Sequence, residues 1–276
     1  RKIKIYGNGG RMIPLENSQY YPADLAENAI QVFGEEDGIF NNSDYILFYA
    51  EGVDQWSVDS QTTNNLYDSK SYYYVNIQGN DGKRMSTMPQ PSAASDVVIN
   101  TFDDYQYHEL DKVNIVRLGR RWFGEQFDFE NQQEIDFKIP NINTNTPVNV
   151  FVYAAAISTT STSMEVKANS ETVGNMTFTP VASSVRADWA TLSANVTATE
   201  NIRITLNYSN NGVPDSKGYL DYIRLKSKRN LVGFGKQFQF QYDAASSSTQ
   251  VGEYQITNAS NITEVSWFQP LTSVPL

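Results

Sequence analysis

Strict alternation of apolar and polar residues is the feature that most constrains the fold of this chain. In residues 202–208 every second residue is apolar: Ile202, Ile204, Leu206 and Tyr208. Because successive side chains of a β-strand point to opposite faces, we expect these four to share one buried face. The residues between them should point elsewhere: Arg203, Thr205 and Asn207.

Similar segments, separated by polar turns, recur through the second half of the chain. They cover residues 135–139, 148–153, 164–168, 172–179, 189–196 and 219–225. The turn Ala168-Asn169-Ser170 indicates a hairpin between two of them. Tyr and Phe, which favour pleated surfaces, number 17 and 14. The sequence therefore predicts an all-β fold, with a jelly-roll-like β-sandwich over residues 119–230.

Residues 1–118 are turn-rich and predict a second, irregular, mainly-β module that is incomplete at its N-terminus. Residues 2–6 alternate as a strand, and Gly7-Asn8-Gly9-Gly10 after them is a tight turn that demands positive φ. The continuous apolar run at residues 44–50 predicts a central strand that is covered on both faces. Residues 102–110 fit either a short helix or an extended arm.

An aromatic segment, residues 111–129, separates the two modules. We interpret five of its residues as the seam that joins them: Arg120, Arg121, Trp122, Phe123 and Glu125. The two arginines could pair with carboxylates of either module, and the rings could lie between the modules. Ordinary core packing is the alternative for these rings. Beyond the seam, Phe127 and Phe129 alternate with acidic residues, as in a half-buried strand.

The absence of Cys and the presence of a single His exclude several classes of site. A thiol nucleophile, a disulfide and a Cys-based metal site are impossible within the chain, and an HExxH helix needs two His. The formal net charge of -10, with no evident basic face, argues against nucleic-acid binding. No apolar run is long enough to span a bilayer, so we do not expect a membrane-spanning protein.

A few polar residues could carry chemistry. His108, surrounded by acidic residues, could be a general base or a pH switch, or an ordinary hydrogen-bonded His. Asp103 with Asp104, or Glu125 with Glu130, could flank a glycosidic bond, although such pairs are usually rim or turn residues.

Two further features could bind a ligand. The acidic turns Glu35-Glu36-Asp37 and Asn80-Asp81 could hold a structural calcium ion, but neither has EF-hand spacing, and solvated turns are the alternative. Aromatic side chains could form a platform that stacks on sugar rings, with core packing as the alternative. The tryptophans that could contribute are Trp56, Trp122, Trp189 and Trp267.

The order of five motifs resembles the region before the catalytic domain in one family, the gingipain-like sortases of the type IX secretion system of Bacteroidetes (the PorU family). The motifs are IYGNGG (5–10), DYILFYAEG (44–52), YHELD (107–111), GRRWFGE (119–125) and YLDYI (219–223). This resemblance extends over most of the chain.

The resemblance implies that the parent protein is a cysteine endopeptidase and transpeptidase at the cell surface, on the outer-membrane exterior of a Gram-negative bacterium. Such a sortase would cleave C-terminal sorting domains from secreted cargo and attach the cargo to surface lipopolysaccharide. Implied partners are cargo C-terminal domains and other attachment-complex proteins, including an outer-membrane β-barrel anchor. The family's catalytic Cys and His lie in a later caspase-like domain that residues 231–276 would lead towards. No position here matches them, so we assign no catalytic, cofactor-binding or metal-binding residue.

Two alternatives stay open beside this hypothesis. One is a carbohydrate-binding or adhesin-like β-sandwich module of a secreted protein, and the other is an enzyme that acts through carboxylates. The chain opens on the alternating residues 1–6 and closes on an extended tail at residues 272–276. We therefore expect a piece of a longer protein that is inactive alone.

Overall fold

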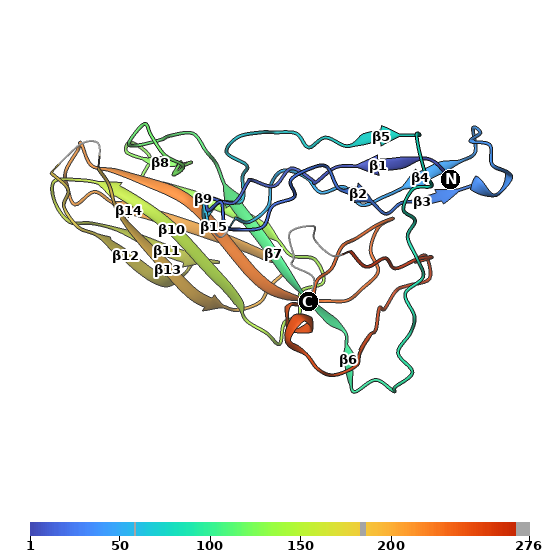
Figure 1. Ribbon diagram of the computed structural model, residues 1–276. Helices are drawn as coiled ribbons and strands as arrows, with labels where there is room; N and C mark the ends of the chain where they lie inside the picture. The colour runs from blue at the N-terminus through green and yellow to red at the C-terminus, as the bar shows by residue number, and fades with distance from the viewer. Residues whose placement is uncertain (58, 183–185, 269–276) are drawn as a thin grey trace. The chain divides into compact units, whose positions relative to one another are not determined.

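The protein consists of two compact units, which Figure 1 shows as a ribbon in a computed structural model. The structure describes residues 1–57, 59–182 and 186–268, so the tail expected at residues 272–276 lies outside the described residues. The first unit comprises residues 1–90 together with the described residues 265–268, and the second comprises residues 91–264. Nearly all of the regular secondary structure in both units is strand, which confirms the all-β prediction. In the described parts of the chain, no helix is long and apolar enough to cross a membrane.

Two antiparallel sheets form a β-sandwich in the second unit. The larger has the order β13-β10-β15-β7, with β8 also paired to β15, and the smaller has the order β12-β11-β14-β9. The strands of the larger sheet are β7 (Thr101–Glu109), β8 (Gln126–Phe127), β10 (Val148–Ile157), β13 (Asp188–Val196) and β15 (Lys217–Asn230). Those of the smaller sheet are β9 (Gln132–Lys138), β11 (Thr162–Ala168), β12 (Glu171–Phe178) and β14 (Asn201–Ser209). The chain passes repeatedly between the sheets, as in a jelly roll.

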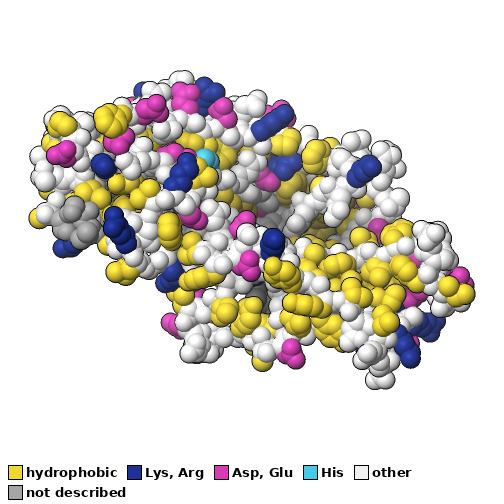
Figure 2. Space-filling view, turned by 90° about the horizontal axis from the view of Figure 1, so that it is seen from above, with side chains coloured by type: hydrophobic (Ala, Val, Ile, Leu, Met, Phe, Trp, Pro, Cys, Tyr) yellow, Lys and Arg dark blue, Asp and Glu magenta, His cyan; other side chains and the backbone are white. Residues whose placement is uncertain are grey.

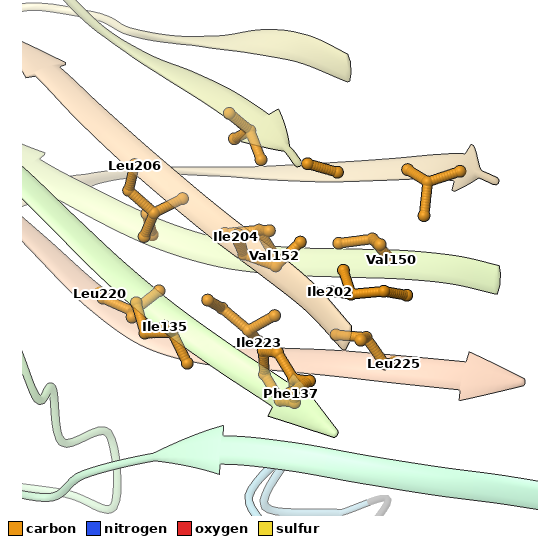
Figure 3. Packing of buried hydrophobic residues seen from close by; sticks show 14 of the residues in the cluster. Ile135, Phe137, Val150, Val152, Ile202, Ile204, Leu206, Leu220, Ile223 and Leu225 are labelled. Atoms are coloured by element: carbon orange, nitrogen blue, oxygen red, sulfur yellow. The ribbon is translucent and has the colours of Figure 1, made fainter. Parts of the chain in front are cut away.

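Apolar residues at alternate positions fill the space between the two sheets, as Figure 3 shows. The larger sheet contributes Val150, Val152, Leu220, Ile223 and Leu225, and the smaller contributes Ile135, Phe137, Ile202, Ile204 and Leu206. All four apolar residues expected to share a face of β14 are buried, which confirms the alternation. Burial of this apolar surface is the main force that holds the sheets together.

The opposite face of β14 is less exposed than the alternation suggested. Thr205 is only 8% exposed. Its cross-strand neighbours are Lys167 and Glu134, whose long side chains lie beside it on the same face. The aliphatic parts of these two side chains thus bury Thr205, although it lies on the outer face of the sheet.

The hairpin expected around residues 168–170 joins β11 to β12. Asn169 and Ser170 have φ values of 47° and 74°. Two consecutive residues with positive φ are typical of the turn that matches the twist of a two-stranded hairpin. The sequence prediction is confirmed here.

The unit boundary lies elsewhere than the sequence suggested. Most of residues 102–110, which fitted either a helix or an arm, lies in β7, and β7 pairs with β15 from Tyr222 to Asn230. The chain accordingly divides after residue 90 and not after residue 118. Residues 231–264 also belong to the second unit, where β16 (Gly252–Tyr254) runs parallel to β6 (Val97–Ile99). These pairings join segments more than 100 residues apart, which local patterns do not reveal.

The strand predicted to run through Phe129 ends earlier. Phe127 closes β8 and is fully buried, whereas Phe129 is 98% exposed. The Asp128 carboxylate accepts a hydrogen bond from the backbone N–H of Phe129 at 2.6 Å, a local contact that competes with strand pairing. The expectation that both rings share a buried face is therefore wrong.

The first unit has small sheets and a sparse core. Its strands are β1 (Lys4–Tyr6), β2 (Glu27–Asn28) and β5 (Tyr74–Asn76) in one sheet, β3 (Gln31–Phe33) and β4 (Tyr45–Leu47) in another, with the 3-10 helix η1 (Glu35–Asp37) between β3 and β4. Among its described residues, Ile5 and Ile30 are the buried apolar side chains. Many large apolar side chains of this unit are exposed, and Figure 2 shows hydrophobic side chains gathered over parts of one face of the molecule.

The prediction that residues 44–50 form a central strand covered on both faces is wrong. β4 pairs with β3 alone, and Tyr45 and Leu47 are 54% and 44% exposed. A continuous apolar run predicts a strand covered on both faces only when other elements pack on both faces. Here the Phe33 ring of β3 stacks on Tyr45 at 4.3 Å, but Tyr45 and Leu47 both stay about half exposed.

The Gly7–Gly10 turn needs glycine for two reasons. Gly9 has a φ of 74°, as the sequence predicted. Gly7 and Gly10 instead allow close approach: a Cβ on Gly7 would lie 2.5 Å from Cδ1 of Tyr73, and one on Gly10 would lie 2.4 Å from Cγ1 of Val53. The turn therefore packs tightly against two later segments of the first unit.

Candidate functional site

The outer face of the larger sheet carries a group of aromatic rings. Pairing between β10 and β15 places Tyr153 opposite Tyr222, and pairing between β10 and β13 places Thr191 opposite Tyr153. Along β10, Tyr153 alternates with Val150 and Val152, which lie in the core. Because strand side chains alternate between faces, the rings project away from the core.

Four of these rings stack in one column. Trp189 lies on Tyr153 with centroids 5.5 Å apart and planes inclined by 10°. Tyr153 stacks on Tyr222 at 5.9 Å and 21°, and Tyr222 on Phe151 at 5.8 Å and 20°. Such stacked pairs stabilise beyond the area that they bury. The column includes the buried Tyr222 and ends on the edge strand β13 with Trp189, which is 60% exposed.

Two arginines lie over rings of the column. The guanidinium carbon of Arg121 is 4.7 Å from the centre of the Tyr153 ring, and that of Arg224 is 5.1 Å from the centre of the Phe151 ring. Cations over ring faces are attracted by the ring quadrupole. The arginines thus hold the rings in place and add positive charge to this face.

A β-bulge sets the position of the acidic partner of Arg121. The register between β10 and β15 shifts after Tyr153, so Asp221 is the extra residue between Leu220 and Tyr222. Asp221 is 2% exposed and accepts a hydrogen bond from Arg121. Burial raises the pKa of Asp221 to about 7, against the lowering effect of Arg121. Burial, and then the charge of Asp221, also raise the pKa of Tyr222 to about 12.

The five residues interpreted as a seam all lie inside the second unit, where the sequence placed them at its border. Phe123 is buried against Tyr219 and Ala155, and its backbone pairs with Val113. Trp122 is 37% exposed and lines a shallow open pocket. The segment thus folds back on itself and packs on the sheet at β15. That it joins two modules stays a prediction.

Glu125 and His108 are within hydrogen-bond distance at the edge of the same sheet. Nε2 of His108 lies 2.8 Å from Oε1 of Glu125. Burial opposes ionisation of Glu125, but the hydrogen bond and charge of His108 outweigh it, so the pKa of Glu125 lies below its ordinary value. Within the described residues, Oε2 of Glu125 is buried without a hydrogen-bond partner. Glu130, its suggested partner for hydrolysis, is exposed.

The other carboxylate pair is engaged in ion pairs. Asp103 binds Lys228 at 2.8 Å and Asp104 binds Arg229 at 3.0 Å. As successive residues of β7, the two carboxylates point to opposite faces of the strand. They therefore do not face one another across a shared site.

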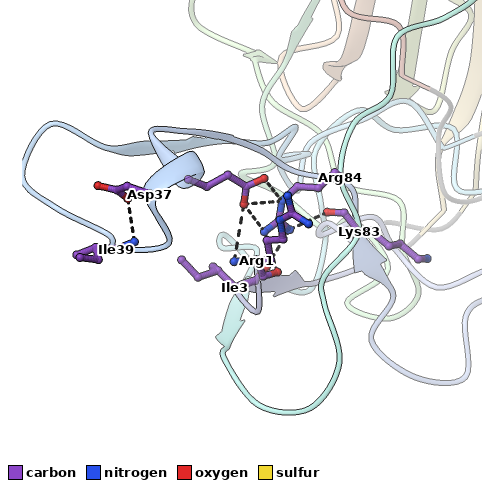
Figure 4. A network of polar contacts seen from close by, with 7 residues as sticks. Arg1, Ile3, Asp37, Ile39, Lys83 and Arg84 are labelled. Atoms are coloured by element: carbon purple, nitrogen blue, oxygen red, sulfur yellow. Dashed lines mark hydrogen bonds and ion pairs between the residues drawn. The ribbon is translucent and has the colours of Figure 1, made fainter.

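The acidic turn at residues 35–37 is part of a polar network, which Figure 4 shows. Glu35 accepts hydrogen bonds from Arg84 at 2.8 and 3.2 Å, which lower the pKa of Glu35, and Arg84 also binds the backbone oxygens of Arg1 and Ile3. Asp37 accepts a bond from the backbone N–H of Ile39. Across the described residues, no group of three or more carboxylate or His side chains is placed to hold a metal ion.

The four tryptophans are divided between the two units. Trp56 and Trp267 belong to the first unit, and Trp122 and Trp189 to the second. Trp189 lies at the end of the aromatic column. The other rings of the column were missed as site residues. A signal was present, since the outward positions of residues 148–153 and 219–225 include aromatic side chains, but the register that brings them together is not local.

Fold and site together define an all-β protein, with a jelly-roll-like sandwich preceded by an irregular mainly-β module. The structure is similar to that of dimeric latent PorU from Porphyromonas gingivalis, with a TM-score of 0.68 and 19% identity. The match covers 87% of this chain and 23% of that chain, so the chain corresponds to about a quarter of the length of PorU. Since neither unit alone makes up 87% of the chain, the match extends into both. The chain thus has the fold of a region of PorU.

Other solved structures match smaller parts of the chain. A family 36 carbohydrate-binding module in complex with calcium and xylotriose matches with a TM-score of 0.28 and 16% identity, over 44% of this chain and 98% of the module. A family 35 module from Clostridium thermocellum matches with a TM-score of 0.29 and 14% identity, over 45% of this chain and 90% of the module. No family model and no curated protein matches the sequence.

Proposed function

We propose that the chain is the non-catalytic β region of a PorU-like sortase of the type IX secretion system. In this proposal it precedes a caspase-like peptidase domain, which it scaffolds at the cell surface, on the exterior of the outer membrane. The parent cleaves C-terminal sorting domains from cargo and attaches the cargo to surface lipopolysaccharide. The chain docks to other attachment-complex proteins, including an outer-membrane β-barrel anchor.

One observation carries this proposal: the match to PorU extends over both units, at a TM-score of 0.68. A sandwich alone is a widespread architecture and supports no particular function. A match that extends over the sandwich and into the irregular module is a narrower likeness. The order of the five sequence motifs supports the same proposal independently.

The test compares the isolated chain with its parent. The gene should continue past Leu276 into a caspase-like segment in which a His precedes a Cys. The purified parent should cleave a peptide that spans the junction of cargo and sorting domain, whereas the isolated chain should not, because it has no thiol nucleophile. Thiol-directed inhibitors should stop the parent and leave the isolated chain unmodified. A gene that ends at Leu276, or turnover of the peptide by the isolated chain, contradicts the proposal.

A second candidate function is that of a carbohydrate-binding module. The observation that favours it is the exposed end of the aromatic column at Trp189.

A further inference from the structure

We propose that Trp189 and the row of polar residues that follows it on β13 bind a neutral oligosaccharide. The inference deepens the second candidate function and is independent of the sortase proposal. Apolar faces of pyranose rings stack on aromatic rings, and sugar hydroxyls need donors and acceptors beside the ring. Both kinds of group occur together on the outer face of this strand.

Trp189 offers a ring face that is fixed and exposed. One face of its indole lies on Tyr153, and the column continues behind it through Tyr222 to Phe151. Trp189 is the terminal ring and stays 60% exposed, although it lies within a regular strand. A sugar ring stacked on its outer face would extend the column by one member. Because stacked neighbours already hold the indole, binding costs little side-chain entropy.

A polar row extends from Trp189 along the same face. Thr191, Ser193 and Asn195 are the next three outward residues of β13, and all are exposed. From Trp189 to Asn195 the strand spans about 20 Å. The row contains hydroxyl and amide groups and no charge. On the same face Arg121 is paired with Asp221, and Arg224 lies over the Phe151 ring of β10. The row on β13 itself therefore suits the hydroxyls of a neutral saccharide better than a phosphate or a uronic acid.

The polar row is also ordered before any ligand binds. Nδ2 of Asn149 on β10 donates to Oγ of Ser193 at 3.1 Å and to Oδ1 of Asn195 at 3.2 Å. These bonds fix the two acceptors, so that the hydroxyl proton of Ser193 and the amide nitrogen of Asn195 remain as donors for a ligand. Trp189 and the three polar residues after it on the outer face of β13 therefore form an exposed strip whose ring and polar groups are already held in place.

The test uses the 276-residue chain on an array of neutral gluco-, galacto-, manno- and xylo-oligosaccharides, followed by calorimetry with the oligosaccharide that binds best. Trp189→Ala should weaken binding by about tenfold or more, because the stacked ring supplies most of the contact. Ser193→Ala and Asn195→Ala should each weaken it less. Affinity should be the same at low and high salt, because no ion pair is made.

Phe129→Ala is the matched control, since Phe129 is 98% exposed and lies outside the column. It should bind like the wild type. Thermal unfolding of Trp189→Ala should match that of the wild type within a few degrees, which separates lost binding from lost fold. Failure of every neutral oligosaccharide to bind, or equal affinity of Trp189→Ala and Phe129→Ala, overturns the inference. Neither outcome affects the sortase proposal, which the cleavage test decides.

Discussion

Asp221 and Arg121, 100 residues apart in the sequence, form a hydrogen-bonded ion pair at the bulge of β15. Arg121 in turn lies over Tyr153, so the pair anchors the segment before β8 to the aromatic face of the sheet. The pair also makes the stability of the fold depend on pH. Burial raises the pKa of Asp221 to about 7, so the folded chain binds a proton there at pH values where the unfolded chain has released it.

The contribution of Asp221 to stability should therefore be present at low pH and be lost as the pH rises through 7. Between pH 5 and pH 8 this loss should amount to roughly 3 kcal/mol. Urea unfolding at several pH values should show the loss in the wild type and not in Asp221→Asn. Asp215→Asn, in an exposed position, should keep the wild-type dependence. Identical pH profiles for all three proteins would rule out this role of Asp221.

The core of the sandwich should be sensitive to cavities. Leu206 is fully buried between the sheets, and Leu206→Ala should lower the free energy of unfolding by about 2–5 kcal/mol. Glu171→Ala, at an exposed position on β12, should change it by no more than about 0.5 kcal/mol. Chemical denaturation measures both. If Leu206→Ala lowered the free energy of unfolding as little as Glu171→Ala, β14 would not face a packed core.

Gly10 should tolerate no side chain. Gly10→Ala places a Cβ 2.4 Å from Cγ1 of Val53 and should destabilise the first unit by about 1–3 kcal/mol. Gly52→Ala is the control, because no atom lies within 4 Å of its Cβ and its φ is not positive. Hydrogen exchange should accelerate in the first unit of Gly10→Ala and stay unchanged in Gly52→Ala. Equal exchange in the two variants would show that the turn is not tightly packed.

The segment interpreted as a seam can be tested by limited proteolysis. Trp122→Ala should open residues 111–125 to cleavage, because Trp122 is partly exposed and its loss spares the core. Phe123→Ala, which removes a buried ring packed on Tyr219, should instead lower the free energy of unfolding by about 3–5 kcal/mol. An unchanged digestion pattern in Trp122→Ala would end the interpretation of Trp122 as an anchor.

Local patterns sufficed for the sandwich and failed where long-range pairing decides. The alternation through Leu206 and the turn at Asn169 depend on a few neighbouring residues, and both predictions are confirmed. The run containing Tyr45 looked like a central strand, but only tertiary packing determines whether a strand is covered.

The candidate site could not be predicted from the sequence for a similar reason. Trp189 was named as one of four possible sugar-stacking residues, yet its column depends on the register of three strands. The Arg121–Asp221 pair depends on a bulge that no local signal marks. The sequence analysis named Trp189 as a candidate ring and Arg121 as a seam residue, and pairing across the sheet brings them together with the other residues of the site.

The most direct test of the central claim is an in-frame deletion of the codons for residues 91–264 from the parent gene in its own bacterium. The cargo is then followed by immunoblotting of the cell surface and of the medium. If the sandwich scaffolds a sortase, cargo should keep its C-terminal sorting domain and fail to attach to surface lipopolysaccharide, although the caspase-like domain is still produced. The substitution Phe129→Ala should leave both processing and attachment intact. Cargo that is trimmed and attached as in the wild type, despite the deletion, would contradict the account.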